Sequence, residues 1–216
     1  MLGSCQLSEL AMISGGKVHQ SYQKGQIIFE QGSRIGGLHC IHQGKVKVSK
    51  VSANGKEQII RLAKEGDVLG YRSLMIGSVY TTAAVALTDC IVCQVPRLDF
   101  LSIIEQNPQF SDSLTRLLAK SLGEAEERIL NTAYKSVRER VAEALLLLHD
   151  VFRPSTNTVF SIPISRDDLA ALASTAKETA SRLLSEFRDE GLVSTQGSRI
   201  RILNLDKLTQ ISTLSD

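Results

Sequence analysis

The stretch from Ser174 to Glu190 constrains the fold more than any other part of the sequence. Its apolar residues recur at spacings of three or four, which predicts a helix with one inward stripe. The stripe consists of Ala176, Ala180, Leu183, Leu184 and Phe187. Thr175 followed by Glu178 matches a capping box, and Gly191 is a suitable helix stop. The opposite face carries Lys, Glu, Ser and Arg. Such side chains suit either an ordinary surface helix or contacts in a DNA major groove.

Length and composition fit a globular protein with one large domain or two small ones, because the chain has 216 residues of which 43% are hydrophobic. The net charge of +2 is too small to indicate a nucleic-acid partner by itself. No basic start leads into a long apolar run, so neither a signal peptide nor a membrane partner is predicted. Four cysteines do not suggest a disulfide framework in a chain of this length, which favours a cytoplasmic location.

The region from Val18 to Val95 has the pattern of short antiparallel strands. Residues 45–49 alternate strictly between polar and apolar, as a half-buried strand does. Glycines separate this run from similar ones, and Asn54-Gly55 is a strong hairpin signal. The other predicted strands are Leu38–Ile41, Gln58–Leu62 and Ile91–Val95. Turns at near-regular spacing predict a compact antiparallel roll or barrel.

A long helix is predicted from Phe110 to about Tyr134, after a short helix from Leu98 to Ile104. Its apolar residues recur almost as in a coiled coil. We call this set the α-helical seam: Leu114, Leu118, Leu122, Ala125 and Ile129. A helix of this length needs a partner for its apolar side. A second copy of the chain is the favoured partner, and the β-region of the same chain is the alternative.

The C-terminal part has the pattern of a winged helix-turn-helix. Ser136 and Glu139 form a capping box, so a helix is predicted from Val137 to about His149, with a domain boundary at 134–136. A short strand is expected from Val159 to Ile162. A helix from Ser165 to Ala173 then precedes the helix that follows Ser174, and residues 192–203 form a hairpin, or wing.

The order of these parts resembles the Crp-Fnr family of bacterial transcription regulators, over about Val18 to Leu205. The motifs that carry the resemblance are Lys24–Gly32, Gln43–Val48, Gly66–Gly70 and Pro96–Phe100, followed by the helix-turn-helix. The resemblance implies an α+β fold. Residues 1–109 would form an antiparallel β-roll of the jelly-roll type that binds cyclic nucleotides, 110–135 a long dimerisation helix, and 136–216 a winged helix-turn-helix.

The resemblance also implies a function, namely that of a homodimer that binds palindromic promoter DNA, works with RNA polymerase and is not an enzyme. Glu178, Ser181 and Arg182 match the Glu-x-x-Ser-Arg pattern of the Fnr branch and are the expected base contacts. A TTGA-type half-site is therefore preferred over TGTGA. The expected phosphate contacts are Thr175, Lys177, Thr179 and Arg199.

Some members of this family bind cyclic nucleotides. At the positions that do so, this chain has different residues. The candidate effector pocket consists of Gly70, Tyr71, Arg72, Ser73, Thr81, Thr82 and Glu126. Tyr71 stands where the family has Glu, and Thr81 replaces the arginine that holds the cyclic phosphate. Arg72 would point to the other side of Tyr71 if this segment is extended. The expectation is a pocket that does not bind cyclic AMP.

The alternative is a cyclic-nucleotide-responsive or haem- or redox-responsive regulator with a non-standard pocket. Cys90 and Cys93 have a metal-ligand spacing, but an offset of three on a strand sends them to opposite faces. The same holds for His39 and His42 as haem or metal ligands. Neither a metal nor a resident cofactor is therefore predicted. Cys40 stays open as a redox-active thiol, as do Cys90 and Cys93, and Cys5 alone does not make an N-terminal iron–sulfur cluster.

Overall fold

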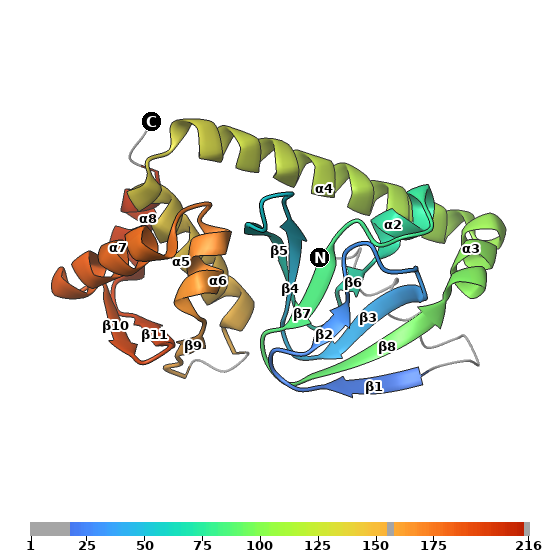
Figure 1. Cartoon of the computed structure of the whole chain (residues 1–216), viewed down its shortest axis with the longest axis horizontal. Coiled ribbons are helices and arrows are strands. Elements are labelled where there is room, and N and C mark those ends of the chain that lie inside the picture. Colours follow the sequence, from blue (N-terminus) through green and yellow to red (C-terminus); the bar gives the residue numbers. More distant parts are fainter. Residues whose placement is uncertain (1–17, 155–157, 214–216) are drawn as a thin grey trace. The chain divides into compact units, whose positions relative to one another are not determined.

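The computed structural model describes residues 18–154 and 158–213, and Cys5 therefore lies outside the described residues. By their internal contacts these residues form two compact units (Figure 1). The boundary falls between Ala125 and Glu126, and Glu57–Ile59 also group with the second unit. Within the described ranges, no helix has both the length and the apolar character needed to cross a membrane.

The first unit contains two four-stranded sheets that form the roll. One sheet has the order β1 (Val18–Tyr22), β8 (Cys90–Pro96), β3 (Gly37–Gln43) and β6 (Val68–Leu69). The other has the order β2 (Ile27–Phe29), β7 (Ala83–Ala86), β4 (Val46–Val51) and β5 (Glu57–Ala63). The pairs β1–β8, β8–β3, β3–β6, β2–β7 and β7–β4 are antiparallel. The predicted antiparallel strands are confirmed.

Two of the predicted turns depend on glycine for different reasons. Gly55 has a φ of 79° in the loop between β4 and β5, where its N–H donates to the Ser52 carbonyl at 2.9 Å. The Asn54-Gly55 signal therefore marks a hairpin, although its loop is longer than two residues. Gly44 has a φ of 102°, and a Cβ there would lie 2.5 Å from both the Asp89 oxygen and the Cys90 sulfur. No other residue fits at position 44 without a shift of the backbone.

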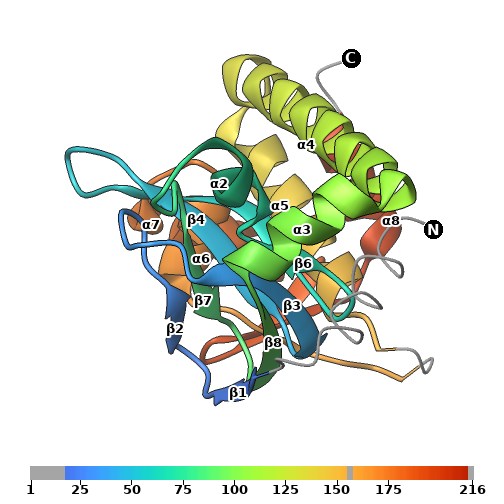
Figure 2. The same ribbon diagram turned by 90° about the vertical axis from the view of Figure 1, so that its right-hand side faces the viewer.

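Three helices accompany the roll, namely α2 (Tyr71–Ile76), α3 (Arg97–Gln106) and the first part of α4 (Pro108–Tyr134), as Figure 2 shows. Phe100 of α3 and Phe110 of α4 meet edge to face at 5.9 Å between ring centroids, inside the roll's core. Leu114 is buried in the same core. The expectation that Leu114 faces a second subunit is therefore corrected, because the roll of its own chain already covers it.

The second unit contains the break between α4 and α5 (Val137–Phe152). Ser136 and Glu139 form the predicted capping box, with Ser136 Oγ accepting from the Glu139 N–H and the Glu139 carboxylate accepting from the Ser136 N–H. The helices α6 (Arg166–Leu172), α7 (Lys177–Asp189) and α8 (Leu205–Ser212) pack against α5. The sequence reasoning did not foresee α8, although Asn204 caps it by accepting from the Lys207 N–H.

A three-stranded sheet completes this unit, in the order β10 (Val193–Gln196), β11 (Arg199–Ile202) and β9 (Ile162–Pro163). The strand predicted at Val159–Ile162 is thus placed too early. Ile162 is buried and pairs with Ile200, whereas Val159 is exposed and pairs with no strand. The apolar pattern alone did not distinguish the exposed valine from the buried isoleucine.

Candidate nucleic-acid interface

The turn before α7 differs from the predicted capping box. Ser174 adopts a left-handed conformation with a φ of 53°, and the Thr175 N–H donates to the Ala170 carbonyl at 3.0 Å. The residue at the N-cap is Ala176, whose side chain has no oxygen to accept a hydrogen bond. The prediction that Thr175 and Glu178 form a capping box is therefore wrong. Glu178 lies instead in the first turn of α7, with its side chain exposed.

The two faces of α7 separate as the helical period predicts, apart from one residue. Ala180, Leu183, Leu184 and Phe187 are buried. Ala176, expected in this stripe, is exposed, because the helix begins only at Lys177. On the outer face Lys177, Glu178 and Arg182 are exposed, while Thr179 and Ser181 are half-buried. Backbone geometry therefore holds the three predicted base-contact side chains on the outward side of one helix.

Lys177 and Arg182 on this face already have carboxylate partners. Lys177 Nζ lies 2.8 Å from an Asp167 oxygen at the start of α6, and Arg182 Nη1 lies 2.5 Å from a Glu186 oxygen one turn later in α7. The hydrogen bond to Asp167 raises the pKa of Lys177. All four side chains reach solvent, so water screens the pairs and they add little stability. A phosphate or a base edge can replace the carboxylates at small cost.

The wing carries exposed cations on one side of a tight hairpin. Gly197 and Ser198 connect Gln196 to Arg199, and Gly197 has a φ of 58°. Ile200 is buried while Arg199 and Arg201 are exposed, as strand alternation predicts. Arg166 supports the turn, since its Nη2 donates to the Gly197 carbonyl at 3.1 Å. Arg199 is thus presented at the end of a supported hairpin.

An arginine that the sequence reasoning did not single out anchors the helix-turn-helix. Arg140 of α5 donates from Nη1 to the Lys135 carbonyl at 2.7 Å and from Nε to the Ala173 carbonyl at 3.1 Å. Its Nη2 also reaches the Ser174 carbonyl at 3.4 Å. One side chain therefore joins the end of α4 to the turn before α7. No local sequence pattern signals this role, because the carbonyls of Ala173 and Ser174 are distant from Arg140 along the chain.

The predicted effector positions lie on α2 and on the segment before β7. Tyr71 and Ser73 point inward and are buried, whereas Arg72 is exposed. The Tyr71 hydroxyl lies 2.9 Å from Ser121 Oγ on α4. Ser73 Oγ accepts from the Thr81 N–H at 3.0 Å and lies 3.2 Å from Thr81 Oγ1. The polar groups at these positions thus bond to one another within the chain.

Two details of the effector prediction change. The segment after Gly70 is the helix α2 and not an extended strand, so the strand argument for Arg72 does not apply even though Arg72 does point to solvent. Gly70 enters this helix with a φ of 83°. Thr82 is buried beside Thr81 in sequence. Glu126 is exposed on α4 and groups with the second unit, not with the roll.

Comparison with known proteins assigns a family to both the roll and the helix-turn-helix. Residues 19–107 match the cyclic nucleotide-binding domain family, and residues 139–211 match the Crp-like helix-turn-helix domain. The cyclic AMP receptor protein of Thermus thermophilus is 31% identical over 191 residues, which cover 88% of this chain and 86% of that protein. The chain belongs to the Crp-Fnr family.

Further relatives agree with this membership. The transcriptional activator protein anr of Pseudomonas aeruginosa is 30% identical over 194 residues, covering 88% of this chain and 78% of that protein. The structure of FixK2 from Bradyrhizobium japonicum superposes with a TM-score of 0.78 and 26% identity, covering 92% of this chain and 98% of that one. The chain is thus a Crp-Fnr transcription regulator with a DNA-binding helix-turn-helix, and it is not an enzyme.

The cysteines and histidines of this Crp-Fnr protein differ in their contacts and in their burial. Cys90 Sγ lies 3.1 Å from the Thr88 carbonyl, whereas Cys93 Sγ lies 3.2 Å from His19 Nδ1. Burial, followed by the neighbouring Cys93, raises the pKa of Cys40 to about 12. Burial also lowers the pKa of His39 to about 4. Between residues 18 and 213, leaving out 155–157, no three His, Cys, Asp or Glu side chains are arranged to hold a metal ion.

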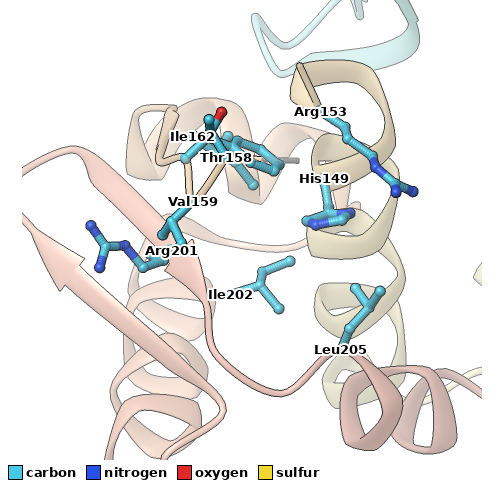
Figure 3. A pocket seen from close by; sticks show the side chains of 9 residues that line it. His149, Arg153, Thr158, Val159, Ile162, Arg201, Ile202 and Leu205 are labelled. Carbon is cyan, nitrogen blue, oxygen red and sulfur yellow. The ribbon is translucent and has the colours of Figure 1, made fainter. Parts of the chain in front are cut away.

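A pocket of about 310 Å³ lies in the second unit, away from the residues predicted to contact DNA bases. Figure 3 shows His149, Ile202 and Leu205 around it, with the guanidinium groups of Arg153 and Arg201 turned away. The His149 ring lies 5.1 Å from that of Phe160, and burial followed by Arg153 lowers the pKa of His149. No single stretch of the sequence signals this pocket, because its walls come from four separate elements.

Proposed function

We propose that this regulator acts in the cytoplasm as a homodimer on palindromic promoter sites and works there with RNA polymerase. The observation that carries the proposal is the outer face of α7, where Lys177, Glu178 and Arg182 are exposed. The opposite face buries Ala180, Leu183, Leu184 and Phe187. A helix of this kind can enter a major groove without disturbing the core behind it.

The chemistry of the side chains suggests which bases each one contacts. Arg182 can donate to guanine O6 and N7, Glu178 can accept from cytosine N4, and Ser181 can touch a thymine methyl group. These preferences are compatible with a TTGA half-site and its complement. Thr175 precedes α7, Lys177 and Thr179 lie in its first turn, and Arg199 lies in the wing. We expect these four residues to contact phosphates.

The second half of α4 supports the dimer. Leu122, Ile129 and Tyr134 have exposed fractions of 62%, 68% and 78%, and Ala125 and Leu130 are exposed as well. Large apolar side chains at spacings near those of a coiled coil are costly to leave in water. An identical helix from a second subunit would cover them. The partner contact would therefore begin near Leu122, beyond the residues that the roll already buries.

We call Tyr71, Ser73, Thr81 and Ser121 the roll's polar cluster. Their contacts support the proposal that the pocket does not bind cyclic AMP. The Tyr71–Ser121 and Ser73–Thr81 contacts contain no cation, and Arg72 points to solvent. A cyclic phosphate at this place would lack a charged, bidentate donor. In titration calorimetry of the full chain with cyclic AMP we expect no binding heat. Saturable binding at micromolar concentration would contradict this part of the proposal.

DNA binding is tested by footprinting on a palindrome of two TTGA half-sites one helical turn apart, with a scrambled sequence as control. We expect protection of both half-sites in the palindrome alone. Absence of protection from any palindromic promoter fragment, under oxidising and reducing conditions, would refute the proposal.

The dimer is tested separately by the double variant Leu122→Glu, Ile129→Glu. We expect a monomer in sedimentation equilibrium and loss of the footprint, because both charges would enter the proposed interface. The matched control is Leu98→Glu, since Leu98 is at least as exposed as Leu122 and Ile129 but lies on α3. A dimer that survives the double substitution would place the interface elsewhere.

A further inference from the structure

Three neighbouring strands of the roll bring one histidine and two cysteines into a single row. The antiparallel register places His19 of β1 opposite Cys93 of β8, and Cys93 opposite Cys40 of β3. Residues directly opposite each other in antiparallel strands point their side chains to the same face of the sheet. We call these three residues the His19–Cys93–Cys40 row.

The distances within the row suit thiol chemistry. Cys93 Sγ lies 3.2 Å from His19 Nδ1, which is within hydrogen-bond distance for sulfur. Opposed residues in antiparallel strands have Cα atoms about 4.5–5.5 Å apart. Disulfides span Cα distances of about 4.4–6.8 Å, so the backbone positions of Cys93 and Cys40 are compatible with a disulfide. Both cysteines are reduced in this structure.

The row runs from the surface into the core. β1 is the edge strand, and His19 is exposed there. Cys93 comes next with an exposed fraction of 9%, and Cys40 lies deepest with 4%. A small oxidant can therefore approach Cys93 from the side of His19, whereas Cys40 is shielded behind it.

The surroundings give the two thiols different roles. An imidazole at hydrogen-bond distance can take the proton of Cys93 and stabilise the thiolate as an ion pair. Cys40 has no such base beside it in the row, and its raised pKa keeps it a thiol. Cys90 lies instead against the carbonyls of Lys45 and Thr88, and burial raises the pKa of its thiol.

We propose that Cys93 is a peroxide-reactive thiol, activated by His19 and resolved by Cys40. The Cys93 thiolate attacks one peroxide oxygen, the O–O bond breaks, and the released hydroxide takes the imidazolium proton to become water. The sulfur of Cys93 is then a sulfenic acid. The Cys40 sulfur attacks it, the S–O bond breaks, and the hydroxyl leaves with the Cys40 proton as a second water. In sum, two thiols are oxidised to one disulfide and one hydrogen peroxide is reduced to two waters.

The test uses the full chain, treated with one equivalent of hydrogen peroxide and then with dimedone, followed by peptide mapping without reductant. In the wild type we expect a disulfide between Cys93 and Cys40. In Cys40→Ser we expect dimedone on Cys93, because the sulfenic acid is no longer resolved. His19→Asn should slow the loss of the Cys93 thiol by about tenfold, because less thiolate forms.

Two matched variants control for general effects. His42→Asn alters a histidine whose ring centroid lies 6.2 Å from that of His19, and it should leave the rate unchanged. Cys90→Ser should leave two products unchanged: the disulfide between Cys93 and Cys40 and, in the Cys40→Ser background, the dimedone adduct on Cys93. The proposal is refuted if the wild-type Cys93 reacts no faster than Cys90, or if His19→Asn reacts at the wild-type rate. A wild-type disulfide from Cys93 to Cys5 would refute the role of Cys40. None of these readouts depends on DNA binding.

Discussion

The polar side chains on the outer face of α7 and those at the effector positions of the roll differ in exposure and in the partners that they bind. On α7, Lys177 and Arg182 extend into solvent and pair with exposed carboxylates. In the roll, Tyr71 and Ser73 turn inward, where they bond to Ser121 and Thr81. Exposed ion pairs exchange readily for another partner, whereas a buried polar group is costly to leave without one. The side chains on α7 can therefore exchange their carboxylate partners for a ligand, whereas the polar groups of the roll already form hydrogen bonds within the chain.

The largest expected effect concerns the interior of the roll, where His39 lies beside the stacked rings of Phe29 and Tyr80. Its Nδ1 is buried and has no hydrogen-bond partner among the described residues. The folded pKa of about 4 lies below the ordinary 6.5. Between these pH values the unfolded chain binds a proton that the folded chain does not, so stability falls as the pH falls from 6.5 towards 4.

Between pH 7 and 4.5 we expect the wild type to lose about 2–3 kcal/mol more unfolding free energy than His39→Phe does. Urea unfolding at both pH values measures this difference. His42→Phe, at an exposed position of the same strand, should retain the wild-type pH dependence. Equal losses in the wild type and His39→Phe would show that His39 is not held neutral in the roll.

The next effect separates base contact from phosphate contact on α7. Arg182→Ala should cost about 1–3 kcal/mol of binding to a TTGA palindrome and should relax the choice at the guanine. Lys177→Ala should weaken all sequences alike and reduce the salt dependence of binding. Competition titrations with matched and substituted sites measure both. If Lys177→Ala changes sequence choice and Arg182→Ala does not, the two roles are reversed.

A smaller effect is expected in the roll's polar cluster. Tyr71→Phe removes the hydroxyl that meets Ser121 and should lower the unfolding free energy by about 1 kcal/mol, because one hydrogen bond is lost and Ser121 keeps access to water. Urea unfolding measures it, with Tyr134→Phe on the exposed part of α4 as the control. An unchanged stability would mean that the Tyr71–Ser121 hydrogen bond does not stabilise the roll.

The smallest effect concerns the carboxylate that holds Lys177. Asp167→Asn removes the partner and a negative charge, so affinity for any DNA should rise by about twofold at low salt. Fluorescence anisotropy with a non-specific duplex measures this change. Asp206→Asn removes the same charge from α8 and is the control. Equal gains in the two variants would point to net charge and not to the Lys177 pair.

The sequence was most informative where a local period decides exposure. It placed the wing arginines, the capping box of α5 and, apart from the exposed Ala176, the buried stripe of α7 correctly. It failed where distant residues decide the outcome. Ser174 takes a left-handed turn beside Arg140, so the N-cap moved from Thr175 to Ala176. The seam of α4 looked uniform, yet the roll covers Leu114 and leaves Leu122 exposed. The disulfide-compatible register of Cys93 and Cys40 depends on strand order, which no spacing along the chain reveals.

The contacts of Arg140 bear on how sequence preference can diverge in such a protein. This side chain ties the turn before α7 to Lys135, the residue that follows α4. In a homodimer joined through α4, the distance between the two half-sites would depend on this junction, while the outer face of α7 would determine which bases each half-site contains. Substitutions at positions 178, 181 and 182 could then change the preferred bases without changing the spacing of the operator. The preferred bases and the spacing of the half-sites could thus change independently of each other during evolution.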